Sequence, residues 1–109
     1  MTEDSIEFMI LTLRKIETIT FSKHFNEKAI IRGLNKDSLT GMLKNPEQIT
    51  AVEYQGYENG GHKYGIPFNI MSNYDLRVIF SISGKGLNVI TAHIQNVKKR
   101  KRFVEWRKG

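Results

Sequence analysis

Three nitrogen-bearing side chains follow one another at a spacing of four residues early in the chain. They are His24, Lys28 and Arg32, and on an α-helix this spacing places them along one stripe beside Phe25 and Ala29. An imidazole beside two cations could move a proton and hold a phosphate. Such a stripe is more often an ordinary solvated helix face, so the spacing alone leaves both interpretations open.

A second imidazole and a second cation are brought together by the last predicted hairpin. A three-residue loop at Gly84 to Gly86 pairs Ser83 with Leu87, and it collects the apolar residues of both strands on one face. This register places Arg77 directly opposite His93 on the other face. A two-residue loop would set an apolar residue against His93, so we expect the three-residue loop. Both side chains could still be ordinary solvent-facing strand residues.

The excess positive charge lies at the C-terminal end of the chain. The formal net charge is +6, yet Lys/Arg and Asp/Glu occur in equal number before residue 98. Cations neutralise phosphates, and aromatic rings stack on exposed bases with about 1–3 kcal/mol each. The mixture favours single-stranded or irregular RNA over duplex DNA, since no helix-turn-helix is evident. The predicted nucleic-acid-binding residues are Lys98, Lys99, Arg100, Lys101, Arg102, Trp106 and Arg107. A solvated terminus and an anionic membrane surface are the alternatives.

Helices are expected in the first half of the chain. Ser22 is a typical N-cap and Gly33 a typical stop signal, while Asn45-Pro46 ends the last helix, because the residue before proline avoids the helical region. The expected elements are a helix over residues 6–16, a strand over 18–21, a helix over 23–32 and a short helix over 36–43.

Strands are expected beyond Pro46, where the apolar period changes to two. They cover residues 49–57, 63–71, 76–83 and 87–94, with Asn59-Gly60-Gly61 and Ser72-Asn73 marking turns. Gly65 and Pro67 weaken the second of these strands. Because proline cannot donate to a ladder, we expect that strand at a sheet edge or bulged near Pro67.

These elements predict an α+β fold in which N-terminal helices pack on a small twisted antiparallel sheet. The 109 residues fit one domain, predicted over residues 1–97, with residues 98–109 as a basic aromatic tail.

The absence of cysteine excludes a disulfide framework and suits a cytoplasmic location. No apolar stretch reaches the roughly 18–20 residues of a membrane span. The histidines lack metal-ligand spacing and no glycine-rich phosphate loop precedes a helix, so neither a metal nor a cofactor is expected.

The segment His24-Phe-Asn-Glu-Lys-Ala-Ile-Ile-Arg-Gly-Leu, followed by Asn-Lys-Asp-Ser-Leu and Asn45-Pro46-Glu, resembles small RelE-like ribonuclease toxins. An uncharacterised family of that superfamily has a histidine, a basic residue four positions on and Arg-Gly-aliphatic eight positions on. The leading helix and the Thr-Phe-Ser strand resemble the MqsR type. The resemblance covers the central part of the chain without the basic tail. Lys28 stands where arginine is commoner, and Phe25 stands where a small residue is usual.

The resemblance implies a RelE-like or microbial-ribonuclease-like fold and a metal-independent endoribonuclease of toxin–antitoxin type. Some members act on ribosome-associated RNA, and an antitoxin, here expected to be acidic, holds them inactive. Cleavage by the 2′-hydroxyl of RNA needs a base, an acid and cations for the phosphorane. The candidates are His24 and His93 for proton transfer, Lys28, Arg32 and Arg77 for the phosphate, and Tyr64 for positioning. No argument from the residues separates base from acid.

Two other functions stay open at this stage. One is a non-catalytic nucleic-acid-binding or regulatory protein that keeps the fold without the chemistry. The other is an interaction module whose basic tail binds a protein partner.

Overall fold

A five-stranded sheet in the order β1-β5-β4-β3-β2 forms the centre of the computed structural model, which describes residues 6–99. The strands are β1 Thr18–Phe21, β2 Glu53–Glu58, β3 Gly61–Met71, β4 Tyr74–Ser83 and β5 Gly86–Asn96. Strands β2 to β5 are antiparallel as predicted, and β1 adds a short parallel strand beside β5. The α+β prediction is confirmed, with a mixed sheet in place of a purely antiparallel one.

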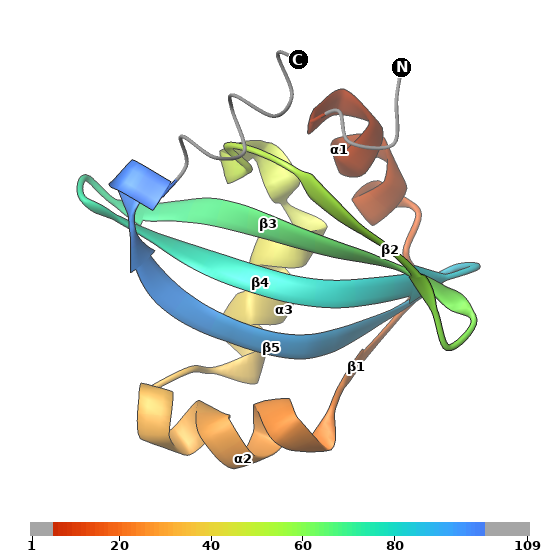
Figure 1. Ribbon diagram of the computed structural model, residues 1–109, viewed down its shortest axis with the longest axis horizontal. Helices are drawn as coiled ribbons and strands as arrows, with labels where there is room; N and C mark the ends of the chain where they lie inside the picture. The colour runs from red at the N-terminus through yellow and green to blue at the C-terminus, as the bar shows by residue number, and fades with distance from the viewer. Residues whose placement is uncertain (1–5, 100–109) are drawn as a thin grey trace.

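The helices are α1 Ile6–Arg14, α2 Lys23–Arg32 and α3 Lys36–Lys44, with short 3-10 helices η1 Pro46–Gln48 and η2 Val97–Lys99. Figure 1 shows α3 behind the sheet and α2 running below β5. The predicted caps are present: Ser22 Oγ accepts a hydrogen bond from the Phe25 amide at 3.0 Å, and Gly33 ends α2 at a φ of 68°. Within residues 6–99, no helix has the length and apolar character needed to cross a bilayer.

The hydrophobic core lies between the helices and one face of the sheet. Its buried residues include Met9, Leu13, Phe25, Leu39, Leu43, Tyr64, Ile66, Phe68, Val78, Phe80, Leu87 and Val89. Tyr64, predicted to position a substrate, is only 3% exposed in this core, so that prediction is wrong. Side chains alternate along a strand, and Tyr64 shares the helix-covered face with Ile66 and Phe68.

The last hairpin has a different turn from the predicted one and still reaches the predicted pairing. Ser83 pairs with Gly86, so the loop has two residues, and Gly84 has the positive φ of 58° that the first position of a type II′ turn requires. The register then shifts between Ile79 and Phe80 on β4.

The shift is a β-bulge at Ile90, where β5 carries one more residue than β4. At this point β5 stops pairing with β1, and Ser22 at the start of α2 forms the next hydrogen bonds to it. The Ser22 amide donates to the Val89 carbonyl at 2.8 Å, and Ser22 Oγ donates to the Ile90 carbonyl at 2.7 Å. Beyond the bulge Arg77 pairs with His93, which confirms the predicted neighbours.

Strand β3 lies inside the sheet between β2 and β4, so the expected edge position is wrong. Pro67 pairs with Arg77 without a register shift; the shifts on either side of β3 occur at Tyr54/Gly56 and Asn69/Met71. The Pro67 carbonyl accepts from the Thr50 amide at 3.1 Å, so the edge of Pro67 that lacks an N–H faces the segment before β2. Proline therefore removes no ladder bond to β4.

Candidate functional site

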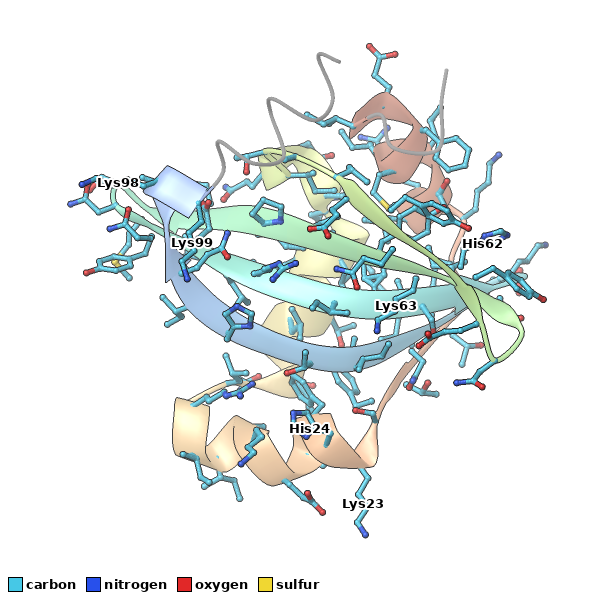
Figure 2. The ribbon with its side chains drawn as sticks, in the orientation of Figure 1. Lys23, His24, His62, Lys63, Lys98 and Lys99 are labelled. Carbon is cyan, nitrogen blue, oxygen red and sulfur yellow. The ribbon has the colours of Figure 1, made fainter. Side chains whose placement is uncertain are left out.

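The second face of the sheet, on the side away from α3, carries polar and charged side chains, with a few apolar residues between them, in rows across the strands. Successive rows are Pro67, Arg77 and His93; then Glu53, Gly65, Ile79 and Thr91; then Lys63, Ser81 and Asn88. Within residues 6–99 no α-helix lies over this face (Figure 1), and Figure 2 shows Lys63 and Lys99 on it. We call it the open face.

Three cations from three different elements lie near enough to His93 on the open face to oppose its protonation. Arg77 is its direct neighbour on β4, Arg32 comes from the end of α2, and Lys99 comes from η2. We call these four residues the basic cluster. Burial of the half-buried ring is the main cause that lowers the pKa of His93, followed by the charges of Arg77, Arg32 and Lys99. The neutral imidazole is thereby favoured.

Arg32 is fixed to the sheet by two hydrogen bonds from its Nη1 atom. One goes to Thr91 Oγ1 at 3.0 Å and the other to the Ala92 carbonyl at 2.9 Å. These bonds hold the end of α2 against β5 at Ala92, the residue before His93.

Arg77 is held by a carboxylate that the sequence did not single out. Its Nη2 lies 3.1 Å from Glu53 Oε2, and the two side chains are 22% and 28% exposed. The pair crosses β3 at Gly65, where a Cβ would stand 2.8 Å from Gln55 Nε2 and 3.3 Å from Arg77 Nη2. A glycine inside a strand is a known sign of close approach, and it is the signal that could have pointed to this bridge.

The other predicted residues of the stripe remain on α2 without such a fixed position. His24 is exposed and lies on the side of the helix that faces β5 (Figure 2), and Lys28 is half-buried. Phe25 and Ala29 anchor the helix, being 1% and 7% exposed. The structure thus places Arg32, Arg77 and His93 close together. His24 and Lys28 remain on α2, beside the open face.

Of the predicted nucleic-acid-binding residues, Lys98 and Lys99 are exposed in η2 at the end of β5. The Lys98 amide donates to Asn96 Oδ1 at 2.9 Å, which shapes this turn. The remaining predicted residues lie outside the described part of the chain: Arg100, Lys101, Arg102, Trp106 and Arg107.

The open face carries the kinds of group that promote cleavage of a phosphodiester. A neutral imidazole can accept a proton, and neighbouring guanidinium and ammonium groups can stabilise an anionic phosphorane. Among residues 6–99, no group of three His, Cys, Asp or Glu side chains stands close enough to hold a metal ion.

Comparison of the chain with protein-family models, curated proteins and solved structures found no match. The resemblance to RelE-like toxins therefore remains a hypothesis, carried by the residues quoted above.

We expect Arg77→Gln to raise the pKa of His93, because one of the charges that oppose protonation is removed. Burial still acts in the variant, so the pKa should stay below that of free histidine, about 6.5. Since the unfolded chain binds this proton at higher pH than the folded chain, His93 makes the protein lose stability as pH falls below about 6.5. NMR titration of the ring and urea unfolding across that pH range measure both effects.

The matched control for this titration is Lys85→Gln, which removes an exposed cation at the far end of the same hairpin. It should leave the His93 titration unchanged. Equal titration curves in the wild type and the Arg77 variant would contradict the electrostatic account of the cluster.

Proposed function

We propose that this chain binds single-stranded RNA on its open face and cleaves it as a metal-independent endoribonuclease. The observation that carries the proposal is the basic cluster: Arg77 pairs with His93 across the sheet, Arg32 is bonded to the residues just before it, and Lys99 follows β5 in η2. Cations positioned on rigid elements bind phosphate without having to be ordered first. A neutral imidazole among them suits proton transfer at neutral pH.

In the proposed reaction the 2′-oxygen of the RNA attacks the adjacent phosphorus, and its proton goes to His93. The bond from phosphorus to the 5′-oxygen breaks, and that oxygen takes a proton from an acid. The products are a 2′,3′-cyclic phosphate and a 5′-hydroxyl. Arg77 stabilises the charge that builds up on the phosphorane oxygens. His24 on α2 is the candidate for the acid.

A non-catalytic RNA-binding protein is the second candidate. The Arg77–Glu53 ion pair favours it, because a cation that is already paired with a carboxylate binds phosphate less strongly than a free one. The toxin–antitoxin assignment, a ribosome-associated substrate and an acidic antitoxin stay predictions that rest on the resemblance.

RNA binding is expected to weaken steeply as salt rises, because cations that bind phosphates release counterions. On single strands the slope of log affinity against log salt is about 0.7 for each phosphate neutralised. The double variant Lys98→Gln/Lys99→Gln should lower both the affinity and this slope, by about 0.7 for each phosphate that the two lysines neutralise in the wild type. Fluorescence anisotropy of a labelled single-stranded RNA in EDTA, over a series of salt concentrations, measures both quantities.

The control removes the same charge elsewhere. Lys15 and Lys44 are exposed, and Lys44 belongs to α3 on the other side of the sheet. Lys15→Gln/Lys44→Gln should leave the slope unchanged. If both double variants reduce the slope equally, binding follows net charge alone and the open face is not the binding surface.

A further inference from the structure

A small pocket lies on the open face at the end away from the basic cluster. Its volume is about 160 Å³, and β1, β4 and β5 all contribute to it. Thr18 and Thr20 come from β1, Ser81 and Ser83 from β4, and Gly86, Leu87 and Asn88 from β5. Thr20, Asn88 and Ser81 stand in one row across the three strands, since Thr20 pairs with Asn88 and Asn88 with Ser81.

The pocket has a mainly apolar wall, and the polar groups set into it suit the hydroxyl groups of a ligand. Among the described residues that line it, none is charged and none is aromatic, so it offers a phosphate no cation and a base no ring to stack on. Serine and threonine hydroxyls both donate and accept, and an amide does the same through separate atoms. Thr20 Oγ1 donates to Asn88 Oδ1 at 3.0 Å, which orients the amide; its N–H groups bind no partner among residues 6–99 and can donate to a ligand.

The size of the pocket also limits the ligand. Sites for drug-sized molecules measure about 300–1,000 Å³, so this one takes a unit as small as a sugar. Its place on the sheet adds a second limit. Ser81 lies four residues from Arg77 along β4, a distance of about 13 Å at the rise of a strand. A short stretch of polynucleotide bound at the basic cluster can therefore extend into the pocket.

We infer that this pocket is a ribose subsite that reads the 2′-hydroxyl of a neighbouring nucleotide and so makes the open face prefer RNA to DNA. The inference rests on the proposed RNA-binding function and adds the residues that set the specificity. Thr20, Ser81 and Asn88 form hydrogen bonds to the sugar hydroxyls, while the basic cluster holds the phosphates of the same strand. The 2′-hydroxyl is the group that distinguishes RNA from DNA at such a site.

The test compares the affinity of the full chain for a short single-stranded RNA with its affinity for DNA of the same sequence. Thr20→Val, Ser81→Ala and Asn88→Ala should each weaken RNA binding about two- to tenfold, the effect of removing one hydrogen bond. DNA binding and the salt slope for RNA should not change. Thr20→Ser restores the hydroxyl and should restore RNA affinity. Ser38→Ala, on α3, is the matched control, and thermal unfolding checks that every variant is folded.

Two results would overturn the inference while leaving the proposed function intact. In one, the pocket variants bind RNA as tightly as the wild type; in the other, they weaken RNA and DNA binding equally. Either result would mean that RNA binds in a salt-dependent way without a contact between its ribose and the pocket. A wild-type chain that binds neither polynucleotide would contradict the proposed function, and the inference would fall with it.

Discussion

Replacing His93 by alanine is expected to lower the rate of RNA cleavage in EDTA by about 10²–10⁴-fold, the usual contribution of a positioned acid or base. The imidazole is the group in the basic cluster that can accept a proton at neutral pH, because burial and three nearby cations lower its pKa. The arginines and Lys99 remain in the variant, so RNA affinity and its salt slope should change little. Single-turnover cleavage of end-labelled RNA, with and without ribosomes, measures the rate.

The control for this variant is another histidine on the same sheet. His62 is exposed on β3, where its Nδ1 lies 2.9 Å from the Tyr54 hydroxyl, and its register opposite Ile82 places it on the face that His93 does not share. His62→Ala should cleave at the wild-type rate. Equal cleavage by the wild type and His93→Ala would remove His93 from the mechanism. A wild type that binds RNA yet never cleaves it would favour the non-catalytic function.

Phe25→Ala is expected to cost about 3–5 kcal/mol of stability, as other buried phenylalanines do when truncated. The Phe25 side chain is 1% exposed, and its ring centroid lies 4.8 Å from that of Phe21 on β1. Domains of this size have about 5–15 kcal/mol in total, so the variant should unfold at much lower urea. Because Phe25 anchors α2, which carries Arg32, RNA affinity should fall as well. Urea unfolding followed by circular dichroism measures the first effect.

The same helix supplies a control, another large apolar residue that is exposed instead of buried. Ile31 is 78% exposed, so Ile31→Ala should change the free energy of unfolding by less than about 0.5 kcal/mol. A large loss in this variant would mean that a partner or a second copy covers α2 in solution. A small loss in Phe25→Ala would mean that α2 is held chiefly by the hydrogen bonds of Ser22 and Arg32.

Local signals in the sequence predicted the elements well. Ser22 and Gly33 bound α2 as expected, and Asn59 and Gly60 both have positive φ in the first hairpin turn. Each of these residues acts within a few positions of itself, so its effect can be read without knowledge of the rest of the fold. The partnership of Arg77 with His93 was also predictable, because alternation of apolar residues along two adjacent strands limits their register.

Contacts across the sheet could not be predicted in the same way. The parallel pairing of β1 with β5 joins residues 68 positions apart, such as Thr20 and Asn88, and no nearby residue signals it. The Arg77–Glu53 ion pair depends on two strands that are not neighbours and on the space above Gly65. The small pocket on the open face was equally hard to predict, because its lining comes from β4 and from β1, which is not a neighbour of β4 and which pairs with β5 over a long sequence separation.

The bulge at Ile90 also bears on how this hairpin could change in length. Ile90 is the extra residue of β5, and the residues on either side of it already pair with successive residues of β4, Ile79 with Thr91 and Phe80 with Val89. A relative that lacks one residue at this point would therefore form a regular ladder with His93 still opposite Arg77. A relative that lacks one residue elsewhere in β5, nearer to His93, would instead move the imidazole toward the hydrophobic core. Alignments of such relatives should place their gaps at Ile90.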